Sequence, residues 1–345
     1  MPSITKLLRT AKQYGASDIY LSVGAKPALR INGDLVIVEE HEILTKEITE
    51  NYLLEIMTEK QKKKFEETSD LDFSISLPEI ARFRVNVFVQ RKGIGAVLRV
   101  IPDNVNSLDD LHLPDCLKKI PHFLNGLVLL TGPTGCGKST TLAAIINEIN
   151  KNQTKHIITI EDPIEYIHDN QKSYLEQREV GTHTKNFQTA LRAALREDTD
   201  VILIGEMRDL DTISLALTAA ETGHLVLATL HTSGAAKSLD RIIDVFPAAQ
   251  QNQIRTQVAE TLKAVVWQNL LKTKDGKGRV AACEILFANH AISNLIRKNQ
   301  NFQINSIIET NKQLGMQTMR SALSDLVKAD IITTEEAQKY MPIEE

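Results

Sequence analysis

Nine residues near the middle of the chain constrain its fold more than any other stretch. Residues 132–140 match the pattern G-x-x-x-x-G-K-[ST] of a phosphate-binding loop. In this pattern the glycines let successive backbone N–H groups point into one concavity, the lysine reaches the outer phosphates, and the hydroxyls can coordinate Mg²⁺. We therefore expect an ATP site made by Gly132, Pro133, Thr134, Gly135, Cys136, Gly137, Lys138, Ser139 and Thr140.

The residues on either side of the loop support this interpretation. Gly126–Thr131 is a short apolar run, as a buried parallel strand requires. After the loop, Leu142, Ile145 and Ile149 keep helical spacing, so a helix should begin at the loop and direct its positive N-terminal end at the phosphates. A glycine-rich turn that binds nothing would need neither the lysine nor the flanking strand and helix.

Three further apolar runs follow, and each ends in polar residues. The runs alternate with helical patterns, which predicts a largely parallel sheet covered by helices. The apolar run 156–160 is followed by the polar segment 161–165, the run 201–204 by 205–209, and the run 225–230 by 231–232. Because ligands of open α/β sheets bind at the carboxyl ends of the strands, we expect all three polar segments at the edge that holds the phosphates.

Phosphoryl transfer requires positioned charge, Mg²⁺ and an oriented nucleophile. We expect Glu206 to be the base that orients the attacking water, with Glu161 and Glu165 helping to hold that water or the hydrated Mg²⁺. One such carboxylate could instead cap a helix. His231 is predicted to hydrogen-bond near the γ-phosphate, whereas His224 is as readily a satisfied core residue as a ligand.

The metal ligands are predicted from the residues that the chain has and from one that it lacks. The run 201–204 is followed by Gly-Glu and not by the aspartate usual in P-loop enzymes, so direct ligation of Mg²⁺ by that residue is in doubt. The hydroxyls of Ser139 and Thr140 should therefore carry more of the coordination, partly through water.

Composition predicts a two-domain protein of the cytosol. The 345 residues exceed one ordinary domain, and 42% hydrophobic and 24% charged residues are typical of globular chains. No apolar run approaches the ~20 residues of a membrane span and no signal-type segment begins the chain, so we expect no membrane insertion. Three scattered cysteines suit neither disulfides nor zinc, and a net charge of −4 gives no electrostatic footprint for nucleic acid.

Three segments are predicted from the patterns along the chain. Residues 1–103 combine strand-like and helical stretches and should form a small α+β domain. Residues 104–121 have few apolar periodicities and should be a linker that could hinge. Residues 122–345 should form the ATP-binding domain, whose end is mostly helical with one hairpin around 275–278. Arg84 and Arg99 in the first domain could be ordinary exposed charges or groups that face phosphate.

Together these motifs resemble the ATPases of type IV pili and type II secretion, and among them the pilus retraction ATPases. The resemblance runs essentially end to end and rests on four segments, 132–140, 161–166, 203–209 and 224–232. The first domain begins almost at the chain start, and the longer extension and the four-cysteine zinc motif of assembly ATPases are absent from the sequence.

Two segments near the end of the chain bear on the branch of that family. Residues 291–298 are similar to the retraction motif A-I-R-N-L-I-R-E, with departures at Ser293 and Lys298, and the match continues through 315–319. The departures leave open a paralogous pilus or secretion ATPase with an altered duty in retraction.

The resemblance implies a PAS-like domain joined to a RecA-like ATPase domain, with six chains in a ring. It implies that ATP hydrolysis powers pilus retraction and twitching motility, from the cytoplasmic face of the inner membrane and through a membrane platform protein. In that family, arginines of the N-terminal domain reach the nucleotide. Arg84 and Arg99 best match them, with Arg82 a near alternative, and we expect them to serve their own chain's site because the linker joins the two domains.

Two rival functions follow from the same loop. A DNA-translocating RecA-like motor would need a basic, aromatic-lined channel, against which the acidic balance argues. A nucleotide-controlled switch that hardly hydrolyses ATP would not need Glu206. ATP turnover measured with and without DNA distinguishes the three functions.

Overall fold

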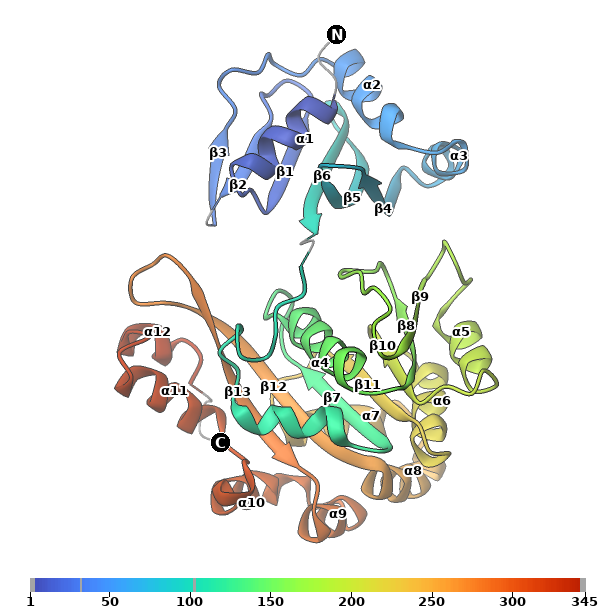
Figure 1. Cartoon of the computed structure of the whole chain (residues 1–345), viewed down its shortest axis with the longest axis vertical. Coiled ribbons are helices and arrows are strands. Elements are labelled where there is room, and N and C mark those ends of the chain that lie inside the picture. The colour runs from blue at the N-terminus through green and yellow to red at the C-terminus, as the bar shows by residue number, and fades with distance from the viewer. Residues whose placement is uncertain (1–3, 32, 102–103, 342–345) are drawn as a thin grey trace. The chain divides into compact units, whose positions relative to one another are not determined.

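The computed structural model describes residues 4–31, 33–101 and 104–341. They belong to two compact units, Met1–Asn104 and Val105–Glu345 (Figure 1). Each unit has a hydrophobic core of its own. The α/β class predicted for the chain is confirmed, and the units are described separately below.

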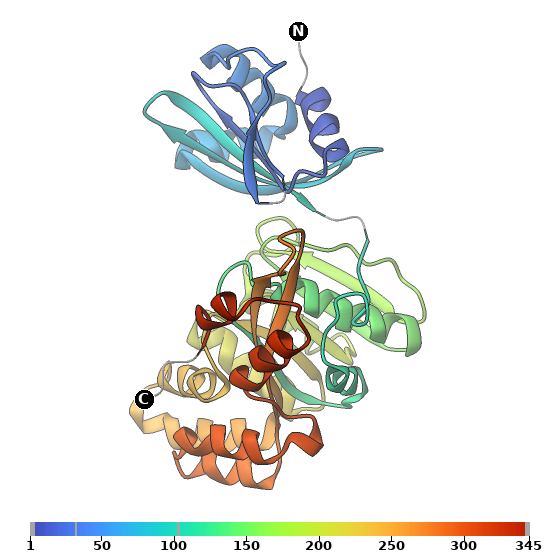
Figure 2. The ribbon, with the colours of Figure 1, turned by 90° about the vertical axis from the view of Figure 1, so that its left-hand side faces the viewer.

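The first unit is built on a six-stranded antiparallel sheet in the order β3-β2-β1-β6-β5-β4. Its strands are β1 (Asp18–Ser22), β2 (Ala28–Ile31), β3 (Asp34–Ile37), β4 (Asp70–Leu77), β5 (Ala81–Gln90) and β6 (Gly93–Ile101). Its helices are α1 (Ile4–Gln13), α2 (Lys46–Ile56) and α3 (Glu59–Thr68). Figure 2 shows α1 and α2 on one face of this sheet. A PAS-like fold for this unit stays a prediction.

The alternation of β5 decides which way its side chains point. Phe83, Val85 and Val87 are fully buried in the core, whereas the residues between them point to the other face. Period-two alternation is what a half-buried strand requires. Arg84 therefore lies on the outer face of the sheet, directly opposite Arg99 on β6.

The second unit is built on a seven-stranded sheet in the order β13-β12-β7-β11-β10-β8-β9, parallel except for β13. Its strands are β7 (Gly126–Thr131), β8 (His156–Glu161), β9 (Tyr174–Glu179), β10 (Val201–Ile204), β11 (Leu225–Leu230), β12 (Leu262–Lys272) and β13 (Arg279–Phe287). Its helices are α4 (Lys138–Asn152), α5 (Phe187–Ala194), α6 (Leu210–Glu221), α7 (Ala235–Asp244), α8 (Ala248–Thr261), α9 (His290–Arg297), α10 (Ile304–Thr310), α11 (Met319–Lys328) and α12 (Thr334–Gln338). The 3₁₀ helices are Asp115–His122, Asn301–Gln303 and Lys312–Leu314.

Helices cover both faces of this sheet, as Figure 1 shows for α4 and α8. Every residue of β7, β10 and β11 is buried, which explains why these strands are continuous apolar runs without alternation. Because β7, β11, β10 and β8 are parallel neighbours, their carboxyl ends meet at one edge. The polar segments after them therefore lie beside the phosphate loop that follows β7.

The stretch expected as a linker, residues 104–121, folds onto the second unit. Leu108, Leu113, Leu117 and Ile120 are buried in the main core of that unit. The 3₁₀ helix Asp115–His122 supplies two of them and packs against α4. The segment's apolar residues follow neither a helical nor a strand period although they are buried, so the sequence gives no local sign of this packing.

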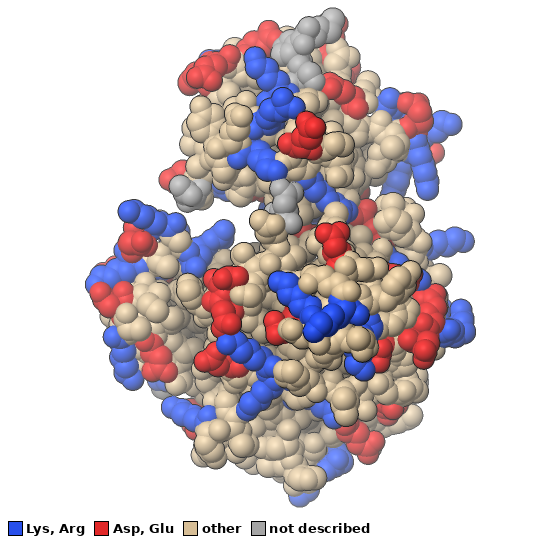
Figure 3. Space-filling view, in the orientation of Figure 1, with Lys and Arg blue, Asp and Glu red and all other residues tan. Residues whose placement is uncertain are grey.

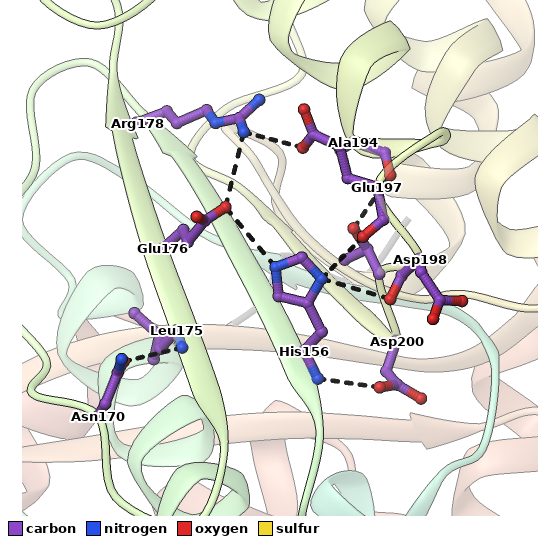
Figure 4. A network of polar contacts seen from close by, with 10 residues as sticks. His156, Asn170, Leu175, Glu176, Arg178, Ala194, Glu197, Asp198 and Asp200 are labelled. Atoms are coloured by element: carbon purple, nitrogen blue, oxygen red, sulfur yellow. Dashed lines mark hydrogen bonds and ion pairs between the residues drawn. The ribbon is translucent and has the colours of Figure 1, made fainter.

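A polar network fixes the amino end of β8 and its edge neighbour β9 (Figure 4). Nδ1 of His156 lies 2.9 Å from the carbonyl oxygen of Glu197, and the backbone N–H of His156 donates to Asp200 at 2.9 Å. Arg178 on β9 pairs with Glu197 at 2.8 Å. These contacts join β8, β9 and the turn after α5.

The last helices pack on the hairpin β12–β13, the hairpin predicted around residues 275–278. Trp267 and Leu271 on β12 form a separate small core with Met319 and Leu323 of α11. In the part of the chain that the structure describes, no helix is long and apolar enough to cross a membrane.

Candidate active site

The phosphate loop turns tightly between β7 and α4. Gly135 and Gly137 have φ angles of 79° and 89°, which only glycine adopts without strain. Gly137 is the N-cap of α4 and no side chain caps that helix end. The first backbone N–H groups of α4 therefore face the loop, as predicted from the sequence, and form a site suited to an anion.

Lys138 directs its ammonium group back into the loop. Its Nζ donates to the carbonyl oxygens of Gly132 at 2.8 Å and Pro133 at 2.9 Å. Burial lowers the pKa of Lys138, while the charges of Glu206 and Glu165 oppose that shift. The loop that carries Lys138 and the segments that carry Glu165 and Glu206 follow parallel strands of one sheet, so they lie at the same edge.

A cavity lies beside the loop, between the ends of β8, β10 and β11. Its lining includes Ser139, Thr159, Glu161, Gly205 and Thr229. The hydroxyl of Thr140 lies 2.9 Å from the hydroxyl of Tyr166, which also lines this cavity. Ser139 is thus the loop hydroxyl that faces the carboxylate-bearing edge, and Thr140 is engaged by the acidic segment.

Glu161 is a shielded carboxylate at the end of β8. It accepts hydrogen bonds from Thr159 at 2.7 Å, from Gln177 at 3.3 Å and from the backbone N–H of Glu165 at 3.4 Å. Burial raises the pKa of Glu161 to about 7, and these hydrogen bonds only partly offset it. Near neutral pH this carboxyl group can therefore gain or lose a proton.

Glu206 follows β10 and points to the end of β11. Its Oε2 accepts from Arg208 at 2.7 Å and lies 3.4 Å from Nε2 of His231. Partial burial alone would raise the pKa of Glu206, but the hydrogen bond from Arg208 and the charge of His231 outweigh it, so this pKa is lowered. Glu206 is therefore an ionised carboxylate held beside a histidine.

Short backbone links hold these strand ends together. The N–H of Met207 donates to the carbonyl oxygen of Thr229 at 3.1 Å, and the hydroxyl of Thr229 donates to the carbonyl oxygen of Gly205. Asp209 is the N-cap of α6, since its carboxylate accepts from the N–H of Thr212 at 2.9 Å. Of the carboxylates after β10, Asp209 is thus the helix cap and Glu206 is the one directed at the site.

The remaining predicted residues lie elsewhere. His224 precedes β11, and its Nδ1 lies 3.0 Å from the carbonyl oxygen of Ala219 at the end of α6, so it caps a helix at the opposite edge of the sheet. Arg84 pairs with Asp72 at 2.6 Å and Arg99 pairs with Asp18 at 2.9 Å, both within the first unit.

Two contributors to the site, Gln177 and Gln268, were not predicted, and Arg208 was predicted at this edge only as a member of the segment 205–209. Arg208 holds Glu206, Gln177 holds Glu161, and Gln268 on β12 contacts the phosphate loop. The sequence contains one indication of a special role for Gln268, because it is a polar residue within the apolar run 264–271. No sequence feature indicates a role for Gln177, because β9 is a polar edge strand without a clear alternation of apolar and polar residues.

Among the residues described, no group of three or more His, Cys, Asp or Glu side chains could hold a metal ion. The donors near the loop are instead hydroxyl and carboxylate oxygens, which suit Mg²⁺ bound jointly with phosphate. On the face drawn in Figure 3, acidic and basic side chains are interspersed over both units.

Comparison with known proteins shows the family of this chain. The family described as "Type II/IV secretion system protein" matches residues 1–339. The chain is 51% identical to a twitching motility protein of Neisseria gonorrhoeae, over 98% of this chain and 90% of that protein. It is 48% identical to the type IV pilus retraction ATPase PilT of Pseudomonas aeruginosa, over 99% of both. A crystal structure of the pilus retraction motor PilT with bound ADP superposes with a TM-score of 0.92 at 46% identity, covering 99% of this chain and 98% of that one.

Proposed function

The chain belongs to the type II/IV secretion system protein family and is a P-loop ATPase, and from this membership we propose that it powers the retraction of type IV pili. One observation supports the proposal most strongly. Lys138, Glu206 and His231 are brought to one edge of a parallel sheet from three separate segments, as hydrolysis of a bound triphosphate requires. Twitching motility is the cellular activity that depends on such retraction.

Each residue of the site has a proposed role. Lys138 and the backbone N–H groups of residues 132–140 bind the phosphates. Glu206 orients the attacking water with its carboxylate, and His231 holds that carboxylate in place while its ring stays near the γ-phosphate. Glu161 and Glu165 hold the water or the hydrated metal ion.

The oxygen donors at the loop fit Mg²⁺. The hydroxyl of Ser139 would hold it, with Thr140 and Glu161 contributing through water. When bound, the ion neutralises charge on the phosphates. Tyr166 contacts the hydroxyl of Thr140 and so links the acidic segment to the phosphate loop.

The mechanical part of the proposal concerns assembly. A closed ring of six chains couples hydrolysis in one chain to movement of its neighbours. The ring acts at the cytoplasmic face of the inner membrane on a platform protein, and Arg84 and Arg99 reach the nucleotide when the first domain closes over it. The similarity to pilus retraction ATPases over the whole chain supports this arrangement.

Gene deletion tests the proposed function in cells. Deletion should abolish twitching and leave surface pili in excess, and wild-type protein should restore both whereas Lys138→Ala should not. The matched control is Lys274→Ala, because Lys274 is an exposed lysine on the β12–β13 turn whose ion pair to Asp330 lies away from the loop. Unchanged twitching and pilus number after deletion would rule out pilus retraction and leave a paralogous secretion ATPase.

A further inference from the structure

The phosphate loop is held from behind by a residue outside its own motif. Gln268 on β12 is 2% exposed, and its Nε2 donates to the carbonyl oxygen of Cys136 at 2.7 Å. Its Oε1 accepts from the hydroxyl of Thr141 at 2.9 Å. One side-chain amide thus joins the loop to the first turn of α4, and both of its ends are satisfied.

The loop glycines are packed against this residue. A Cβ at Gly132 would overlap the carbonyl oxygen of Gln268, and a Cβ at Gly137 would lie 2.9 Å from Nε2 of Gln268. The register explains the contact, because Trp267 pairs with Thr131 and Gln268 is therefore level with the first residue of the loop. Two glycines of the motif thus leave room for the close approach of Gln268.

The planarity of the peptide bond turns this contact into a constraint on the nucleotide site. The carbonyl of Cys136 and the N–H of Gly137 belong to one planar trans peptide, so they point in opposite directions. With the carbonyl oxygen held toward β12, the N–H of Gly137 must point away from β12. Loops of this kind bind phosphate through their backbone N–H groups, so the direction of the Gly137 N–H bears on phosphate binding.

We infer that Gln268 is a positioning residue for phosphate binding. It fixes the peptide between Cys136 and Gly137 and ties that peptide to Thr141 on α4, without touching the nucleotide itself. The inference rests on the proposed function, since it assumes that the loop binds ATP and ADP. A loop oriented in advance loses less conformational freedom on binding, so Gln268 should raise affinity more than it raises the rate of hydrolysis.

The experiment compares Gln268→Met with Gln317→Met. Gln317 is a matched control, because its Nε2 also donates to a cysteine carbonyl oxygen, that of Cys283, at 2.7 Å, but it does not contact the loop. Binding of Mg²⁺-ADP is measured by calorimetry and ATP hydrolysis by steady-state kinetics. For Gln268→Met we expect ADP affinity to fall and KM to rise by about tenfold, or about 1.4 kcal/mol, with kcat within about threefold of wild type. Gln317→Met should bind ADP as the wild type does.

Several outcomes would decide against the inference. ADP affinity equal to that of the wild type in a folded Gln268→Met protein would overturn it, as would an equal loss in Gln317→Met. If Gln268→Met does not fold, Thr141→Val decides alone, because it removes only the bond to Oε1 and should weaken ADP binding about threefold. If the wild-type protein itself binds no nucleotide, the proposed function fails, which is a different result from equal affinities among the variants.

Discussion

Oε2 of Glu206 lies 3.4 Å from Nε2 of His231, so the polar segments after β10 and β11 meet through their side chains. The same carboxylate oxygen accepts from Arg208 at 2.7 Å. Arg208, and His231 when it is protonated, favour the ionised form of Glu206. The site therefore supplies a carboxylate that can orient water while its own proton affinity is kept low.

Replacing Arg208 should change the pH dependence of hydrolysis. Arg208→Met removes the hydrogen bond that lowers the pKa of Glu206, so this pKa rises. A larger fraction of Glu206 is then protonated at a given pH. The acidic limb of the kcat profile should therefore shift to higher pH. Arg192→Met, at an exposed arginine of α5, is the control and should leave the limb in place. An unshifted limb in Arg208→Met would show that Glu206 does not govern it.

The raised pKa of Glu161 should affect stability. A carboxyl group with a pKa of about 7 when folded and about 4.5 when unfolded binds more protons in the folded state, so the free energy of unfolding falls as pH rises between these values. Glu161→Gln removes the carboxyl group and therefore the part of the pH-dependent fall in unfolding free energy that it causes. Relative to wild type, the variant should gain on the order of 1 to 3 kcal/mol between pH 5 and pH 8 in urea unfolding without nucleotide. A stability difference that is independent of pH would contradict the raised pKa of Glu161. The control is Glu260→Gln, at an exposed glutamate of α8.

Much of the fold could be predicted because its signals are local. The apolar run of β7, the glycines of the loop and the spacing of Leu142, Ile145 and Ile149 together specify a strand, a turn and a helix. Buried parallel strands likewise stand out as apolar runs. The packing of residues 104–121 depends on segments distant in sequence, so no local pattern indicated it. The apolar run around Gln268 marks it as an unusual polar residue, but its contact with the phosphate loop joins two distant segments and has no local pattern.

Arg84 offers a test of how the two domains cooperate. Proteins with Arg84→Ala and with Lys138→Ala should each lose ATPase activity, since an arginine directed at transition-state charge can be worth about 10³ to 10⁵ in rate. We expect a mixture of the two to stay inactive, because Arg84 is proposed to serve its own chain. Recovery of ATPase activity on mixing would instead assign Arg84 to the neighbouring chain's site. Arg9→Ala on α1 is the control for general effects of removing an arginine from this domain.

Helix α9 separates packing from the proposed role in retraction. Ile292, Leu295 and Ile296 are buried as predicted, whereas Asn294 and Arg297 are exposed. Asn294→Ala with Arg297→Ala should leave ATP hydrolysis within about twofold and stability within about 0.5 kcal/mol, while complemented cells fail to twitch. Equal loss of ATP hydrolysis and twitching would show that Asn294 and Arg297 contribute to folding or stability and have no separate role in retraction.

Ile296→Ala gives the contrast for that experiment, because Ile296 is fully buried. It should cost about 2 to 5 kcal/mol of stability through the cavity that it creates. Ser293, one of the departures from the retraction motif, donates to the carbonyl oxygen of Ala259 on α8 at 2.8 Å and thus belongs to the packed side of α9.

ATP turnover by the Glu206→Gln protein tests whether Glu206 is the base that orients the attacking water. Phosphate release and ATP binding are measured side by side for wild type, Glu206→Gln and Lys138→Ala, with and without DNA. We expect DNA-independent turnover by the wild type and no turnover by Lys138→Ala. For Glu206→Gln we expect normal ATP affinity with kcat reduced by about a hundredfold or more. Turnover by Glu206→Gln within a few-fold of wild type would contradict it, and the role of base would then pass to Glu161 or Glu165.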